Sequence, residues 1–136
     1  MSKTASSKAS RSIVGAYLEK ARSKLETARI LMEQKRYEDV VSRAYYAAFH
    51  AAQAVLFLEG IKARTHSGVV NQFGLLLVKN GKVDAKYGRF LSNLREDREV
   101  GDYEVYAPIE EEDARNALKE AEEFVKEMER YTKPDA

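Results

Sequence analysis

Apolar residues recur along most of the chain with the 3.6-residue period of an amphipathic helix. The pattern predicts five helical segments, which are 13–33, 37–59, one that starts after Thr65, one that fades near Gly101, and one that follows Pro108. No segment shows the alternation that is typical of a β-strand. We therefore expect an all-α protein, folded as an antiparallel up-and-down helical bundle of four to five helices.

Local signals mark several of the helix ends. Gly60 follows the second helix, where glycine is a common C-terminal stop. Thr65 has a hydroxyl that can cap the third helix, and Asn80 with Gly81 forms a typical turn dipeptide. The segment 102–108 is predicted to be a loop.

The two ends of the chain differ in character. Residues 1–12 are rich in Ser, Lys and Ala and have no apolar period, so we expect a disordered lead-in. One helical domain is expected to fill 13–133.

Composition narrows the class of protein further. The chain has no cysteine, which excludes disulfides and thiolate zinc sites and fits a reducing compartment. Its 23 basic and 22 acidic residues give a net charge of +1, so no overall field favours nucleic acid or membrane. No apolar stretch approaches the roughly 18 residues of a membrane span, and the first residues have no apolar block after their basic ones, so we expect no secretory signal. We expect a cytoplasmic protein with no membrane association.

The second helix is apolar on most sides, which is typical of a buried helix. Its remaining edge carries Arg43, Tyr46, His50 and Gln53, at spacings of three, four and three residues. These side chains line one half-polar stripe about three turns long. The stripe is either a ligand site or a subunit contact.

The fourth helix carries an arginine in its apolar register. Continuing the positions of Leu91 and Leu94 by four residues reaches Arg98. A permanently charged guanidinium on an apolar face needs a partner, a phosphate or an opening to water. Asp102 lies one turn further on, so a structural Arg98–Asp102 ion pair is the alternative to a ligand site.

The chain has two histidines, and each has two interpretations. A helical histidine such as His50 is commonly a hydrogen-bonded packing residue, whereas His66, just after Thr65, can also turn a ring nitrogen into a groove. A carboxylate-bridged metal site in a bundle would place Glu three residues before each histidine. Those positions hold Ala47 and Ala63, so we expect no metal and no other cofactor.

Three blocks of sequence together resemble the HEPN domain, and the resemblance covers about 14–131. The blocks are Ser-Arg-Ala-Tyr-Tyr-Ala-Ala-Phe-His-Ala-Ala at 42–52, Thr-His-Ser-Gly-Val at 65–69 followed by Phe73, and Arg-Glu-Val-Gly-Asp-Tyr at 98–103. The resemblance implies a helical bundle that forms a homodimer. It also implies a minimal nucleotidyltransferase as partner, often in a toxin–antitoxin-like module.

Several branches of that family are metal-independent ribonucleases, in which an Arg and a His that are separated by four to six variable residues meet in the dimer cleft. Arg98 fits the Arg of that motif, but positions 103–105 are Tyr, Glu and Val, and no histidine follows. The usual catalytic histidine is therefore missing from its place.

Three hypotheses follow. In the first, the protein binds a nucleotide or RNA phosphate in a cleft lined by Arg98, Asp102 and Tyr103. The second-rank candidates for that cleft or for the dimer seam are Arg43, Tyr46, His50 and His66. In the second, the protein is an active ribonuclease toxin, with Arg98 on the phosphate and His66 as the base. In the third, it is a structural adaptor without catalysis, in which the arginine pairs internally.

Overall fold

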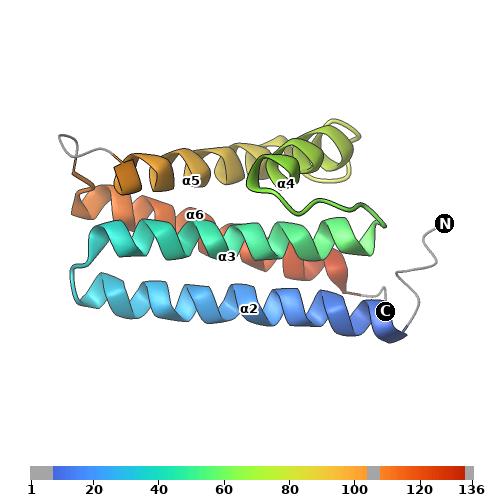
Figure 1. The fold of residues 1–136 in the computed structure, drawn as a ribbon, viewed down its shortest axis with the longest axis horizontal. Coiled ribbons are helices and arrows are strands. Elements are labelled where there is room, and N and C mark those ends of the chain that lie inside the picture. The colour runs from blue at the N-terminus through green and yellow to red at the C-terminus, as the bar shows by residue number, and fades with distance from the viewer. Residues whose placement is uncertain (1–7, 104–107, 134–136) are drawn as a thin grey trace.

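The apolar stripes of the sequence assemble into a bundle of helices lying side by side (Figure 1). The computed structural model describes residues 8–103 and 108–133. Its elements are α2 (Lys8–Glu33), α3 (Tyr37–Leu58), α4 (His66–Gln72), the π-helix η1 (Phe73–Val78), α5 (Ala85–Tyr103) and α6 (Glu111–Thr132). The four long helices alternate in direction, and α4 with η1 crosses beside the start of α5. The predicted all-α up-and-down bundle is confirmed.

Helix α3 is the central element, because it packs against α2, α4, α5 and α6. Six of its alanines have no exposed surface, and we call them the alanine belt: Ala44, Ala47, Ala48, Ala51, Ala52 and Ala54. A methyl side chain lets a neighbouring helix approach closely. The largest side chains of the core fill the space around this belt, among them Phe73 and Phe124, whose ring centroids are 5.4 Å apart.

The local signals for the helix ends are confirmed. Gly60 and Gly81 both adopt a φ of 76°, the left-handed region that glycine enters without strain. Thr65 caps α4, and its Oγ1 accepts a hydrogen bond of 2.9 Å from the backbone N–H of Gly68. A Cβ on Gly68 would lie 2.7 Å from that oxygen, so the cap requires glycine there.

The structure differs from the prediction in two helix boundaries and in the type of one helix. Helix α2 begins at Lys8, so 8–12 are helical rather than a disordered lead-in, because extending a formed helix gains one hydrogen bond per residue. Helix α5 continues to Tyr103 instead of ending near Gly101, where the missing Cβ leaves room for Ile109. The third helix changes to a π-helix over Phe73–Val78. Residues 1–7 and 104–107 lie outside the described part of the chain.

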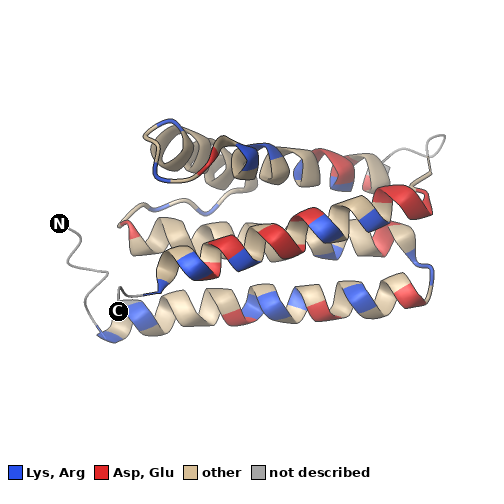
Figure 2. Cartoon of the chain, turned by 180° about the vertical axis from the view of Figure 1, so that it is seen from behind, with Lys and Arg blue, Asp and Glu red and all other residues tan. Residues whose placement is uncertain are grey.

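Helices α2 and α6 are in contact, and we call the surface between them the α2–α6 seam. Acidic and basic residues are interspersed along both helices (Figure 2). Arg22 pairs with Glu129 across the seam, and the Nε of Arg29 lies 2.6 Å from Glu122. Within the described ranges, no helix is both long enough and apolar enough to cross a membrane.

Candidate functional site

The site is built around Arg98 on α5. Leu91 and Leu94, in line with it, are fully buried, whereas 22% of the Arg98 side chain is exposed. The guanidinium turns toward α3, where its Cζ lies 5.2 Å from the ring centroid of Tyr46 and 5.8 Å from that of Tyr45. A cation over an aromatic face is attracted by the ring quadrupole, so the two rings hold the guanidinium from one side.

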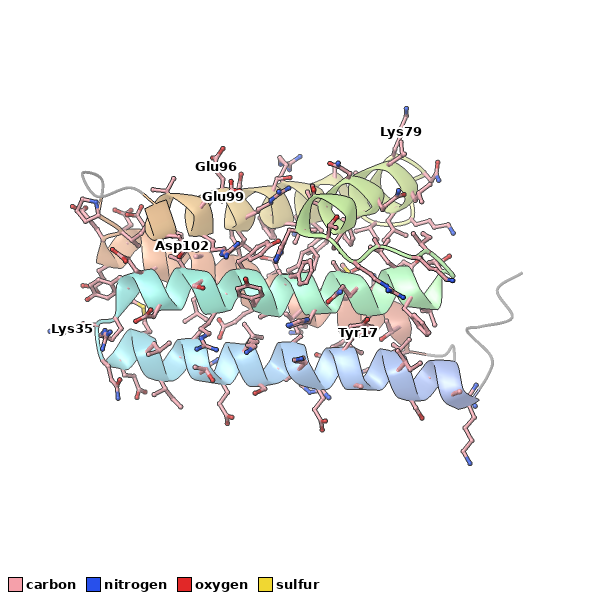
Figure 3. The ribbon with its side chains drawn as sticks, in the orientation of Figure 1. Tyr17, Lys35, Lys79, Glu96, Glu99 and Asp102 are labelled. Carbon is pink, nitrogen blue, oxygen red and sulfur yellow. The ribbon has the colours of Figure 1, made fainter. Side chains whose placement is uncertain are left out.

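The hydrogen bonding of Arg98 is incomplete. Its Nε lies 3.1 Å from Oδ2 of Asp102, so the ion pair of the structural hypothesis is present. The same Nε is buried and has no hydrogen-bond partner among the described residues, which means that its N–H is not directed at that oxygen. Asp102 lies on the side of α5 that faces α3 (Figure 3). The carboxylate offsets the charge of Arg98 but leaves a buried donor unsatisfied.

An aromatic cluster of Tyr45, Tyr46, Phe49 and His66 adjoins the guanidinium. The hydroxyl of Tyr45, a fully buried residue, lies 2.7 Å from Nδ1 of His66. The His66 ring is 4.5 Å from that of Phe49 and 5.6 Å from that of Tyr46, measured between centroids. Since His66 is the first residue of α4, the Thr65 cap fixes where its ring sits.

Burial keeps the ionisable side chains of the cluster neutral. Burial lowers the pKa of His66 below its ordinary value, and the nearby charges of Arg98 and Arg95 lower it further. Burial raises the pKa of Tyr45 to about 12, although the same two arginines oppose the shift. The imidazole and the phenol are therefore both neutral at pH 7.

The hydrogen bond to Tyr45 gives the His66 ring two chemical uses. If Nδ1 carries the proton and donates to the phenol oxygen, Nε2 has a free lone pair that can accept a proton. If the phenol donates to Nδ1, Nε2 carries the proton and can donate to a phosphate oxygen. The ring is thus either a base or an anion ligand.

The half-polar stripe of α3 faces a different space. A groove of about 430 Å³ between α2 and α3 is lined by Arg43, Tyr46 and His50, together with Lys20 and Lys24. His50 contacts Gln53 on its own helix, with its Nδ1 3.0 Å from Oε1 of Gln53. The groove and the Arg98 site therefore share one residue, Tyr46.

The predicted residues consequently fall into two groups. Arg98, Asp102, His66 and Tyr46 come together, whereas Arg43 and His50 lie along the groove. The side chain of Tyr103 lies outside the described part of the structure.

Sequence reasoning missed three members of the site. Tyr45, Phe49 and Arg95 were not among the candidate site residues. The signal for Arg95 was available, because it precedes Arg98 by one helical turn. In the ranges 8–103 and 108–133, no three His, Asp or Glu side chains are grouped in a way that could hold a metal ion.

Comparison with known proteins assigns a family to this arrangement. A family model described as the HEPN domain matches residues 14–131. A protein of Methanocaldococcus jannaschii named "Putative toxin MJ0605" is 41% identical over 112 residues, which cover 82% of this chain and 83% of that protein. A "UPF0332 protein" of Thermotoga maritima is 34% identical, over 87% of this chain and 89% of its own length. "Putative toxin MJ0142" of M. jannaschii is 28% identical, over 84% and 78% respectively.

Proposed function

The chain belongs to the HEPN domain family, and we propose that it is a toxin-like member that binds the phosphate of a nucleotide or RNA through Arg98. Two of the relatives carry the word toxin in their names. The proposal assigns the phosphate to the guanidinium on α5 and a supporting role to the rings around it.

The observation that carries this proposal is the unsatisfied Nε of Arg98. A buried donor that is not directed at an acceptor is unfavourable, and the nearby Asp102 carboxylate offsets only the charge. A phosphate oxygen would accept that hydrogen bond and neutralise the charge, since arginine binds phosphate through two parallel N–H donors. The incomplete hydrogen bonding of the free protein is thus what a bound anion would correct.

The residues beside Arg98 fit the rest of a nucleotide. The ring of Tyr46 is half-buried and lines the groove between α2 and α3, from which a base can stack on it. The neutral His66 can donate to a phosphate oxygen from Nε2. In the absence of a ligand, Asp102, whose side chain is 36% exposed, offsets the positive charge of the guanidinium.

Replacing the guanidinium tests the proposal. We expect Arg98→Gln to weaken binding of AMP and of a short single-stranded RNA by about tenfold to 100-fold, as the loss of a charge-assisted hydrogen bond predicts. Arg89→Gln is the matched control, because Arg89 lies exposed on the same helix and has no ion pair among the described residues. Calorimetry and fluorescence anisotropy measure the affinities, and a thermal melt checks that each variant is folded.

Equal binding by wild type and Arg98→Gln would reject the phosphate site. The adaptor hypothesis makes a contrasting prediction for stability. If Arg98 and Asp102 serve only each other, Asp102→Ala must lower the free energy of unfolding as much as Arg98→Ala does, with no effect on ligand binding.

A second function is favoured by the contact between Tyr45 and His66. In the tautomer that leaves Nε2 unprotonated, a neutral imidazole beside Arg98 can take the proton from a ribose 2′-hydroxyl while the arginine holds the phosphate. His66 would then supply, from α4, the base that is missing after Arg98 in the sequence. The chain would be a metal-independent ribonuclease.

Cleavage of RNA in the presence of EDTA tests this second function. It predicts that wild type cleaves a single-stranded RNA, that Arg98→Ala and His66→Ala do not, and that a 2′-deoxy substitution at the cleaved position protects the strand. Binding of RNA by a folded wild type without any cleavage between pH 6 and 9 would leave the binding function and exclude the nuclease.

The proposed assembly follows from the family resemblance. We propose a cytoplasmic homodimer that acts with a separately encoded minimal nucleotidyltransferase. Light scattering of the purified chain measures its oligomeric state. Co-purification with the nucleotidyltransferase of a neighbouring gene tests the partner, and a monomer that captures no such protein would contradict both statements.

A further inference from the structure

The groove between α2 and α3 is lined by cations that have no acidic partner among the described residues. Lys20 and Lys24 lie one turn apart on α2, and Arg43 faces them from α3. None of the three forms an ion pair within the described ranges. Asp39, which also lines the groove, lies 3.3 Å from Arg36 and is therefore already paired. The groove has an excess of positive charge that its own acidic residue does not neutralise.

The charges of Lys20 and Lys24 act on His50, which also lines the groove. Burial lowers the pKa of His50, the charges of Lys20 and Lys24 lower it further, and only the hydrogen bond with Gln53 opposes the shift. The His50 ring is neutral at pH 7, so it adds a donor or acceptor but no charge. An anion entering the groove would meet three cations and one polar ring.

Tyr46 joins this groove to the Arg98 site. Its ring centroid is 5.2 Å from Cζ of Arg98 and 6.3 Å from the centroid of the His50 ring. One aromatic ring thus separates a guanidinium on α5 from the cations on α2. Proteins that hold single-stranded nucleic acid combine a basic groove with aromatic platforms in this way.

Building on the phosphate site proposed at Arg98, we propose that the α2–α3 groove holds further phosphates of the same ligand. The ligand is then a single strand of RNA longer than one nucleotide. A base stacks on Tyr46, one phosphate lies at Arg98, and the next lies among Lys20, Lys24 and Arg43. The groove volume of about 430 Å³ falls within the range of small-ligand sites.

The dependence of binding on ligand length tests this inference. The ligands are AMP, which has one phosphate, and a labelled hexanucleotide of uridine. The variant is Lys20→Gln/Lys24→Gln, and the matched control is Lys79→Gln/Lys119→Gln. Lys79 points away from the bundle (Figure 3), and both control lysines are exposed and free of ion pairs among the described residues.

We expect the groove variant to bind the hexanucleotide roughly tenfold more weakly than wild type at low salt. Its affinity for AMP should change less than twofold, and the control variant should match wild type for both ligands. The slope of log K against log salt should become shallower by about 0.7 for each phosphate that the variant no longer neutralises.

Each other outcome has one meaning. Equal hexanucleotide binding by the groove variant and the control overturns the groove inference, while the Arg98→Gln result decides the proposed function separately. A decrease in affinity that is the same for AMP and the hexanucleotide also overturns it. A change of oligomeric state in the groove variant would overturn it as well, and would assign the groove to a contact between copies of the chain.

Discussion

Along the α2–α6 seam, Arg22 and Arg29 each meet a glutamate of the opposite helix, and both arginines are about half exposed to water. On the other side of the bundle, Arg98 turns inward against two tyrosine rings, keeps 22% of its side chain exposed, and leaves its Nε without an acceptor among the described residues. Arginines of the seam thus donate a hydrogen bond to a carboxylate of the opposite helix, whereas Arg98 has an Nε without such an acceptor among the described residues.

The difference shows that charge alone does not identify a site. Water screens an exposed ion pair, so the pairs of the seam contribute little to stability and leave nothing for a ligand to complete. A guanidinium held against aromatic rings is screened less, and its unmet hydrogen bond is the feature that an anion can satisfy. The environment of an arginine therefore identifies a ligand site better than the number of arginines nearby does.

The strongest test of this comparison is to disturb the cap that positions His66. In Gly68→Ala the new Cβ would lie 2.7 Å from Oγ1 of Thr65, so the cap or the start of α4 must shift. We expect a loss of roughly 1–3 kcal/mol in the free energy of unfolding and weaker RNA binding. Gly15→Ala on α2 is the control, since no atom lies within 4 Å of its added Cβ, and it should stabilise the protein by about 0.5–1 kcal/mol. Urea unfolding measures both, and equal effects of the two substitutions would refute the assignment.

Removing the hydroxyl that contacts His66 should have a smaller effect. Tyr45→Phe deletes the partner of Nδ1, and we expect a loss of about 1 kcal/mol in stability together with weaker RNA binding. The control is Tyr131→Phe, because the Tyr131 hydroxyl donates a bond of similar length, 2.7 Å, to Glu59 away from the site. RNA affinity and thermal melts are measured for both variants. A similar decrease in affinity for Tyr131→Phe would show that the effect is one of general stability.

The pKa of His66 offers a further way to distinguish the Arg98 site from the seam. Because the pKa of His66 is lowered by burial and then by Arg98 and Arg95, the unfolded chain binds a proton there at a higher pH than the folded chain does. The contribution of His66 to stability is therefore complete above about pH 6.5 and is lost as the pH falls below that value. Arg98→Gln removes one of the two charges and should raise the pKa of His66, whereas Arg22→Gln should not. An NMR titration of the ring protons measures it, and an unchanged His66 in Arg98→Gln would contradict the prediction.

The smallest effect is expected at the seam itself. A double-mutant cycle of Arg29→Gln and Glu122→Gln should give a coupling energy of at most about 0.5 kcal/mol, since both side chains are more than one-third exposed. Neither substitution should change RNA binding. A coupling energy well above about 1 kcal/mol would mean that water does not screen this ion pair, and would contradict the contrast between the seam and the Arg98 site.

Those features of the fold that depend on a few neighbouring residues could be predicted from the sequence. Gly60, Thr65 and Gly81 mark helix ends through backbone chemistry that acts within one turn, and the structure confirms all three. The register that ends in Arg98 is also local, because four-residue steps along α5 stay on one face. The start of α2 at Lys8 could not be predicted, since 8–12 carry no apolar stripe.

The composition of the site depends on how distant helices cross. His66 reaches the rings beside Arg98 only because α4 packs against both α3 and α5, and no periodicity encodes that crossing. Lys20 and Lys24 have the same sequence pattern as any solvated helix face. They line a groove only because α2 packs against α3 with Arg43 and Tyr46 opposite them.

The alanine belt of α3 has a consequence for how this protein can change. Every alanine of the belt is fully covered by neighbouring helices, so any larger residue there would push a helix away. The half-buried or exposed edge of the same helix, with Arg43, Tyr46 and His50, has no such restriction. In a deep mutational scan, tolerance along α3 should therefore follow a helical period. New ligand preferences could arise along that edge while the framework behind it stayed the same.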